Sequence, residues 1–268
     1  MPPEQEPKPS ATSRFAELVT GPAEALAARL DEAVLLIAAH AREGMDVASY
    51  VAALDELAKG VEDASTDAVV SQLFGADGFR GNVEEYYDPR NSYLDQVIDR
   101  RLGIPITLAV VMMEVAKRVG IELEGVGMPG HFLVRDGAAL RDPFEGGRTL
   151  TIDECEARFH AVHGPDAPFH PSLLEVADAP SIVARILANL RQVHLSRRDS
   201  NSLEWVLRLR GLLPAATIEE RAERAGVLAA LGRFDEAADV LDALAPEAGD
   251  DRERQLLGKA RQLRARLN

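Results

Sequence analysis

The sequence predicts an α+β fold, with a helix-rich N-terminal region, a core of one buried helix and a small antiparallel sheet, and C-terminal helical repeats. Three observations lead to this prediction. Residues 105–120 are apolar on almost every side, which is typical of a buried central helix. Two extended runs then flank an Asp-Gly pair, as the strands of a hairpin do. Helical periodicity returns from residue 181 onward.

The elements before the core are expected to be helices. Apolar residues recur at helical spacing through residues 14–40, and Gly21-Pro22 divides this stretch into a short and a longer helix. Further helices are predicted over residues 46–62, from a cap at Ser65 or Thr66 to Phe74, and from Ser92 to Gly103. Residues 1–12 are rich in proline and glutamate, which predicts a disordered tail.

The predicted hairpin brings a histidine and an aspartate together. Asp136-Gly137 lies between the two extended runs, and Asp-Gly favours a two-residue type I′ turn. With that turn Arg135 pairs with Ala138, and His131 lies directly opposite Asp142. A four-residue loop instead makes His131 and Asp142 diagonal neighbours on one face, whereas a three-residue loop separates their faces.

A carboxylate beside an imidazole fixes the tautomer of the ring and stabilises the imidazolium ion. His131 and Asp142 therefore supply two thirds of a nucleophile–base–orienter triad. The competing interpretation is a purely structural contact that ties two strands together.

Four segments share a pattern with a known family. They are residues 86–94, 100–108, 127–135 and 141–148. In this order they resemble the bacterial SirB-type family, a branch of the transglutaminase-like superfamily that tetratricopeptide-like helices usually follow. The resemblance covers residues 35–250 and implies a papain-like or transglutaminase-like core.

The resemblance matches His131 and Asp142 with the histidine and aspartate of the superfamily. In its active enzymes a Gly-Val-Cys segment opens the buried helix. Here that segment reads Gly103-Ile104-Pro105, so Pro105 stands at the position of the nucleophile. Thr107 lies about 200° around the helix from Pro105 and is expected to make cap or core hydrogen bonds.

Cys155 is the single cysteine, so an intrachain disulfide is excluded. It is expected in the first turn of a helix opened by Thr151, where Glu154 completes a capping box. A structural role is favoured because the sequence shows no electropositive setting that would activate the thiol. An approach of Cys155 to His131 stays open as an alternative.

Polar residues of the first two motifs are predicted to line a binding cleft beside the central helix. They are Tyr87, Asp88, Asn91, Asp99, Arg100 and Arg101. The helix N-terminus with the two arginines nearby suits a carboxylate or a chain terminus. The competing interpretation is that these residues make caps and salt bridges. His160, His163 and His170 are interpreted as loop histidines, and no metal or cofactor is expected.

The C-terminal region resembles tetratricopeptide repeats. Pro214 and Pro246 close two helical segments at nearly the ~34-residue period of that repeat. Leu231–Phe234, followed by Glu236-Ala237, resembles its usual helix-to-helix turn. The expected organisation is a tail (residues 1–12), a transglutaminase-like domain with N-terminal helices (13–175) and a tetratricopeptide-like helical domain (180–268).

Composition narrows the class of partner. A net charge of −14 argues against nucleic acid, because binding to phosphates rests on basic residues. No signal peptide and no membrane-spanning run is evident, which predicts a cytoplasmic protein. The leading hypothesis is a non-catalytic protein that binds a protein or peptide partner in a regulatory or scaffolding role. The alternative is a hydrolase or acyltransferase that uses His131 and Asp142 with Cys155 or an activated water.

Overall fold

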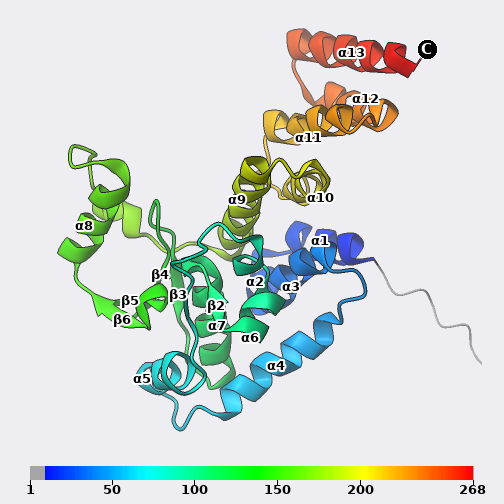
Figure 1. Cartoon of the computed structure of the whole chain (residues 1–268). Helices are drawn as coiled ribbons and strands as arrows, with labels where there is room; N and C mark the ends of the chain where they lie inside the picture. The colour runs from blue at the N-terminus through cyan, green and yellow to red at the C-terminus, as the bar shows by residue number, and fades with distance from the viewer. Residues whose placement is uncertain (1–9, 268) are drawn as a thin grey trace, which may run out of the picture. The chain divides into compact units, whose positions relative to one another are not determined.

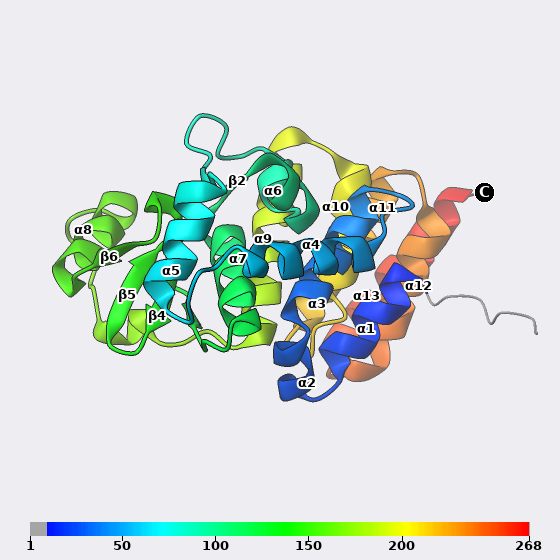
Figure 2. The same ribbon diagram turned by 90° about the horizontal axis from the view of Figure 1, so that it is seen from below.

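The computed structural model describes residues 10–267 (Figures 1 and 2). The chain divides into two compact units, Pro22–Ile186 and a second that combines Met1–Gly21 with Leu187–Asn268. The predicted tail lies outside the described residues up to residue 9. Helix α1 (Ala11–Thr20) begins inside the predicted tail, because the hydroxyl of Ser10 accepts a hydrogen bond from the amide of Ser13 and caps it.

Helices surround the core of the unit Pro22–Ile186. They are α2 (Ala23–Ala28), α3 (Leu30–Ala41), α4 (Val47–Lys59), α5 (Thr66–Val70), α6 (Leu94–Arg100), α8 (Ile152–His163) and the start of α9 (Ala179–Arg197). Caps at Asp46 and Ser65 open α4 and α5, in line with the residue pattern. The long helix predicted up to residue 40 is interrupted once more, at Arg29, and α5 continues into a π-helical turn, Ser71–Ala76.

Helix α7 (Pro105–Arg118) is the buried centre of this unit. Eleven of its fourteen residues are buried, and α3, α4, α5, α6 and the strands β3 and β4 all contact it. In Figures 1 and 2 it lies beside the strands. Pro105 occupies the first turn, where the missing N–H leaves no bond unmade. The predicted central helix is therefore confirmed in place and in burial.

A four-stranded antiparallel sheet has the order β3 (Glu124–Val126), β4 (Leu133–Asp136), β5 (Ala139–Asp142) and β6 (Arg148–Leu150). Asp136 pairs with Ala139 and Arg135 with Leu140, so the predicted pairing of Arg135 with Ala138 is wrong by two residues. Gly137 has a φ of 57°, and no positive φ accompanies it at Ala138, which is the pattern of a type II′ turn with glycine first. The glycine takes the first turn position instead of the second.

Two very short strands hold a loop against the start of α7. Strands β1 (Arg80–Gly81) and β2 (Leu102–Gly103) pair in parallel, and the loop of residues 82–93 connects β1 to α6. A Cβ atom on Gly81 would lie only 2.6 Å from the ring of Phe144. Glycine at position 81 therefore lets the aromatic ring approach the backbone.

The second unit consists of helices. After α1 and the end of α9 it contains α10 (Ser200–Arg210), α11 (Ile218–Ala230), α12 (Phe234–Leu244) and α13 (Asp250–Arg264), with each helix from α10 on packed against the next. The turn between α11 and α12 uses Gly232 at a φ of 76°, which suits glycine. Small and leucine side chains such as Ala225, Leu228 and Ala237 fill the core of these hairpins.

Candidate functional site

His131 and Asp142 form a hydrogen-bonded pair. Nε2 of His131 lies 2.9 Å from Oδ2 of Asp142. Asp142 is the last residue of β5, and His131 stands two residues before β4, so the observed register makes the two residues diagonal neighbours. The direct opposition predicted from the type I′ turn is therefore wrong, and the contact belongs to the register shifted by two residues. The side chain of Asp142 is 0% exposed and that of His131 is 13% exposed.

Asp142 is held by more than the histidine. Its Oδ1 accepts hydrogen bonds from the amides of Phe144 (2.9 Å) and Glu145 (3.4 Å), which start the short 3-10 helix Pro143–Glu145. Its Oδ2 lies 3.1 Å from Nη1 of Arg158. These contacts neutralise a carboxylate that is shielded from water, and a buried charge needs such partners.

Arg158 is the member of the site that sequence reasoning missed. It lies on α8, and its Nη2 donates a hydrogen bond of 2.5 Å to Oε2 of Glu145. That bond is the main cause that lowers the pKa of Glu145. The available signal was the capping box at Thr151, because a helix starting there places position 158 on nearly the same face as the buried Cys155.

The remaining nitrogen of the His131 ring has no hydrogen bond to residues 10–267. Since Nε2 donates to the carboxylate, Nδ1 is left as the acceptor. The edge of Phe144 meets the His131 ring at right angles, with centroids 6.2 Å apart, and Phe144 meets Tyr86 in the same way at 6.0 Å. Tyr87 contacts Tyr86 and is 67% exposed. A row of aromatic rings thus leads to the surface from the His131–Asp142 pair, which is called the dyad below.

The hydroxyl of Thr107 is committed to the fold. Its Oγ1 donates to the carbonyl of Asn91 (2.7 Å) and accepts from the amide of Ile104 (3.2 Å), and the residue is fully buried. The predicted cap and core bonding of Thr107 is therefore confirmed.

Cys155 lies in a dry environment. Thr151 and Glu154 form the predicted capping box, and the thiol is fully buried among apolar side chains that include Val126, Leu133 and Leu150. Burial raises the pKa of the Cys155 thiol, so the nucleophilic thiolate is disfavoured. No hydrogen bond joins Cys155 to His131 among the described residues.

The predicted binding residues separate into two groups. Asp88, Asn91 and Arg100 come together: Nη1 of Arg100 lies 3.4 Å from Oδ1 of Asn91, and its Nη2 lies 3.8 Å from Oδ2 of Asp88. Asn91 is fully buried and donates to the carbonyls of Glu85 (2.7 Å) and Tyr86 (3.2 Å). This group fixes the shape of the loop that carries the tyrosines.

Asp99 and Arg101 make other contacts. Asp99 accepts a hydrogen bond of 2.8 Å from the hydroxyl of Tyr50. Arg101 closes α6 in the left-handed region, with a φ of 59°, and its guanidinium stacks 4.5 Å from the ring centroid of Phe79. The caps and ion pairs of the competing interpretation describe Asp99, which also lies 3.8 Å from Nη1 of Arg42, and Arg101. They describe Asp88 as well, because its carboxylate caps the 3-10 helix Pro89–Asn91 and pairs with Arg90.

The histidines assigned to a loop are partly helical. His160 and His163 lie in α8, because the capping box at Thr151 starts a helix that ends at His163, before Gly164. The interpretation as loop histidines is wrong for these two residues. His170 precedes the 3-10 helix Pro171–Leu174. Within residues 10–267, no three side chains of the metal-binding types converge.

Arg185 supports the segment that carries His131. From α9 its Nη2 donates to the carbonyls of Met128 and His131, both at 2.7 Å, and its guanidinium lies over the ring of Phe132. Burial lowers the pKa of Arg185. The arginine thereby holds the turn before β4, which places the imidazole beside Asp142.

A buried helix, a short antiparallel sheet and a His–Asp pair at the ends of its two inner strands define the class. Residues 29–188 match the family described as the transglutaminase-like superfamily, and the chain belongs to that superfamily. No helix in the described part of the chain has the length and apolar character needed to cross a membrane.

Several curated proteins are similar to parts of this chain. A UPF0162 protein of Xylella fastidiosa (strain Temecula1) is 51% identical over 134 residues, which are 47% of this chain and 48% of that protein. A UPF0162 protein of Pseudomonas aeruginosa is 36% identical over 176 residues, 62% of this chain and 64% of that protein. Human F-box only protein 21 is 38% identical over 113 residues, 38% of this chain and 17% of that protein.

The chain spans about half the length of the Xylella relatives and somewhat more of the Pseudomonas one. No solved structure matches.

Proposed function

We propose that this chain is a non-catalytic transglutaminase-like protein that binds a protein or peptide partner beside His131, in a regulatory or scaffolding role. The observation that carries the proposal is a base with its orienter to which, among residues 10–267, no nucleophile is hydrogen-bonded. Pro105 offers no reactive atom, the hydroxyl of Thr107 is bonded on both sides, and the thiol of Cys155 is buried. Covalent catalysis requires an activated nucleophile at hydrogen-bond distance from its base.

The surface beside the dyad suits a protein partner. Val83 is 76% exposed and Tyr87 67% exposed, and both lie on the loop that Asn91 holds from within. Exposed aromatic side chains on a preformed loop contribute much binding energy, because little conformational entropy is lost when a partner docks. The net charge of −14 supports a partner other than nucleic acid. We further propose a cytoplasmic location.

The C-terminal helices support the same role. We propose that α11 and α12 form a tetratricopeptide-like repeat and that the chain is of the SirB type. The short glycine turn at Gly232 and the sequence Leu231–Phe234 favour this assignment. Stacked helical hairpins present extended binding surfaces.

Site-specific crosslinking tests the proposal. A photo-crosslinking residue at Tyr87 should capture a defined partner in cells, whereas the same residue at the exposed Ile152 should not. The purified partner should then bind wild type, and the double variant Tyr86→Ala, Tyr87→Ala should lose at least tenfold in affinity. The matched variant Ile152→Ser should bind as wild type does. Equal affinity of all three proteins would refute binding at this surface.

A second function is favoured by one observation, the unoccupied Nδ1 of His131. A His–Asp dyad with a free ring nitrogen can activate a water, and the chain would then be a hydrolase. The covalent version, an acyltransferase or peptidase-like enzyme, would use Cys155. Turnover of an amide, ester or peptide substrate that disappears in His131→Gln would establish the enzyme. Turnover that also disappears in Cys155→Ser, together with adduct formation at Cys155, would identify the covalent route.

A further inference from the structure

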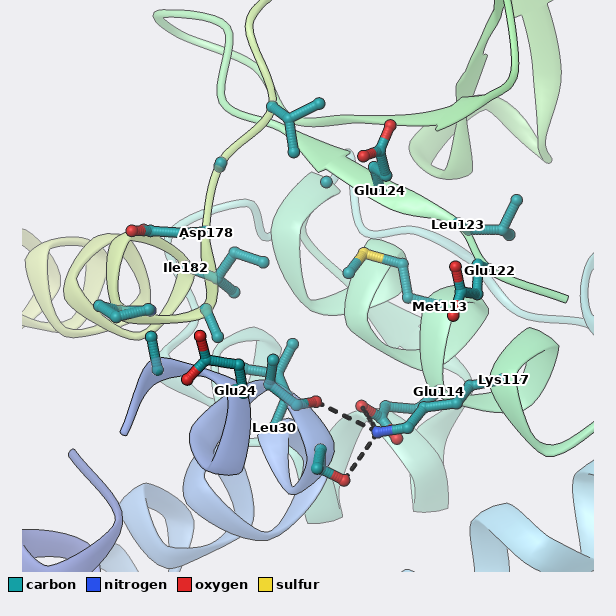
Figure 3. Close-up of a pocket in the computed structure, with 18 of the residues that line it drawn as sticks. Glu24, Leu30, Met113, Glu114, Lys117, Glu122, Leu123, Glu124, Asp178 and Ile182 are labelled. Carbon is teal, nitrogen blue, oxygen red and sulfur yellow. Dashed lines mark hydrogen bonds and ion pairs between the residues drawn. The ribbon is translucent and has the colours of Figure 1, made fainter. Parts of the chain in front are cut away.

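A separate pocket lies on the same unit and shares no lining residue with the dyad. Its volume is about 540 Å³, which is in the range of ligand pockets. Its wall is formed by α2, the second half of α7, the chain from Ile121 to Gly125 and the start of α9. Figure 3 shows Met113 at its centre, with Leu30, Leu123 and Ile182 around it. The interior is therefore apolar.

Carboxylates surround this apolar interior. Five of the lining residues are acidic and one, Lys117, is basic. The lysine is already engaged, because its Nζ donates to the carbonyls of Ala27 (3.1 Å) and Ala28 (2.7 Å) at the end of α2. Within the described residues, the side chains of Glu24, Glu122 and Glu124 make no ion pair or hydrogen bond. Lys117 pairs with the fourth glutamate, Glu114, at 3.7 Å. The three other glutamates thus carry negative charge without a counterion among the described residues.

The pocket also borders the outer edge of a strand. Strand β3 is the outermost strand of its sheet. The carbonyl of Gly125 points away from β4, since it accepts a hydrogen bond of 2.8 Å from the amide of Ala177. Leu123 directly precedes β3. Backbone groups alternate along a strand, so a continuation of β3 to Leu123 would point its groups the same way as those of Gly125. Among the described residues, the chain's own pairing with this edge consists of the bridge between Val126 and Val176 and the hydrogen bond from Ala177 to Gly125, because α9 begins at Ala179.

We propose that this edge binds an extended basic peptide, in which an apolar side chain between two cationic ones enters the pocket. The peptide would continue the sheet beside Leu123, by hydrogen bonds between main chains. Its apolar side chain would contact Met113 and Leu123, and its flanking lysines or arginines would lie opposite Glu122 and Glu124. Opposite charges on facing strands stabilise such pairing. This site is independent of the surface proposed for Tyr86 and Tyr87.

The probe is a fluorescein-labelled peptide of sequence Lys-Leu-Lys-Leu-Lys, measured by fluorescence anisotropy against the full chain. We expect saturable binding that weakens with salt, and amide shifts at Leu123 and Gly125 in NMR spectra. The peptide Glu-Leu-Glu-Leu-Glu should not bind. A copy of the basic peptide with N-methylated leucines should lose at least tenfold in affinity, because its main chain can no longer donate at those positions.

Variants test the location. The double variant Glu122→Lys, Glu124→Lys should weaken the basic peptide at least tenfold. The variant Ala27→Trp, which adds bulk at an exposed position of the rim, should do the same without any change of charge. The control Glu43→Lys, Glu62→Lys makes the same charge change at exposed positions outside the pocket and should bind as wild type does. Thermal unfolding verifies that each variant is folded.

Several results would overturn the proposal. They are absence of saturable binding to wild type, equal weakening by the control variant, and equal affinity for the N-methylated peptide. Displacement of the peptide by spermidine at the peptide's own affinity would also overturn it, because the pocket would then bind free amines.

Discussion

One carboxylate oxygen of Asp142, Oδ2, lies 2.9 Å from Nε2 of His131 and 3.1 Å from Nη1 of Arg158. The arginine in turn donates to Glu145, so the dyad is one end of a charged network that links β5 to α8. A carboxylate with a guanidinium and two backbone amides as partners does not depend on the imidazole for its neutralisation. The pair can therefore persist for structural reasons when no reaction takes place.

The first prediction concerns this network. Asp142→Ala should destabilise the fold by about 2–4 kcal/mol, because it removes the cap of a 3-10 helix and the buried partner of Arg158, which keeps its pairing with Glu145. His131→Gln should cost less than about 1.5 kcal/mol, since it removes one hydrogen bond at a partly exposed position. Urea unfolding measures both. Equal losses for the two variants would contradict the ranking.

The second prediction concerns Thr107. Thr107→Val should destabilise by about 1–3 kcal/mol, because the amide of Ile104 and the carbonyl of Asn91 lose a buried partner. Thr107→Ser keeps the hydroxyl and should recover the larger part of that loss. Denaturant titration of the two variants provides the measurement, and an unchanged midpoint for Thr107→Val would show that the hydrogen bonds contribute little.

The third prediction concerns the thiol. Because Cys155 is buried and burial raises its pKa, a thiol reagent should label it slowly in the folded protein. In denaturant, labelling should proceed at the rate of a free cysteine. A spectrophotometric thiol assay with and without urea distinguishes the two states. Rapid labelling of the native chain would instead favour the covalent enzyme.

The fourth prediction concerns pH. Burial lowers the pKa of His194, which is hardly exposed. The unfolded chain then binds more protons than the folded one below pH ~6.5, so stability is complete above that value and falls as the pH decreases through the folded-state pKa. The slope contributed by His194 cannot exceed about 1.4 kcal/mol per pH unit. His194→Gln should flatten the dependence of the unfolding free energy between pH 7 and 5, relative to wild type.

The fifth prediction concerns two helical glycines. A Cβ added at Gly226 in α11 or Gly258 in α13 would meet no atom within 4 Å. Alanine at either position should raise stability by about 0.5–1 kcal/mol, because glycine is a poor helix former. Gly81→Ala serves as the contrast, since its Cβ would collide with Phe144. A rise in the melting temperature for the first two variants and a fall for the third is the expected pattern.

The residue pattern was sufficient to predict the buried helix and the capping box at Thr151, since both depend on residues close together in the sequence. It was insufficient for the hairpin register, because the Asp-Gly pair suits more than one turn and the choice between them is made by the pairing of Asp136 with Ala139. Strand β6 spans only Arg148–Leu150 and is stabilised by β5, so its own residues gave too weak a signal.

The residues of the candidate site divide in the same way, into those that the sequence predicts and those that it does not. His131 and Asp142 were predictable from the chain near the turn, whereas Arg158 reaches Asp142 from α8, and Arg185 reaches the backbone of His131 from α9. Contacts between elements distant in sequence leave no periodic trace. The pocket beside β3 was missed for this reason as well, because four separate segments form it.

The start of α7 is anchored in a way that leaves position 105 open to replacement. Thr107 and Asn91 anchor the first turn through the amide of Ile104 and not through residue 105, and proline at that position adds only a modest preference of about 0.4–1 kcal/mol through the unfolded chain. Cysteine in place of Pro105 would leave those anchors intact. The conformation of this turn is therefore set by its neighbours, and the residue at position 105 can be replaced with a small energetic effect.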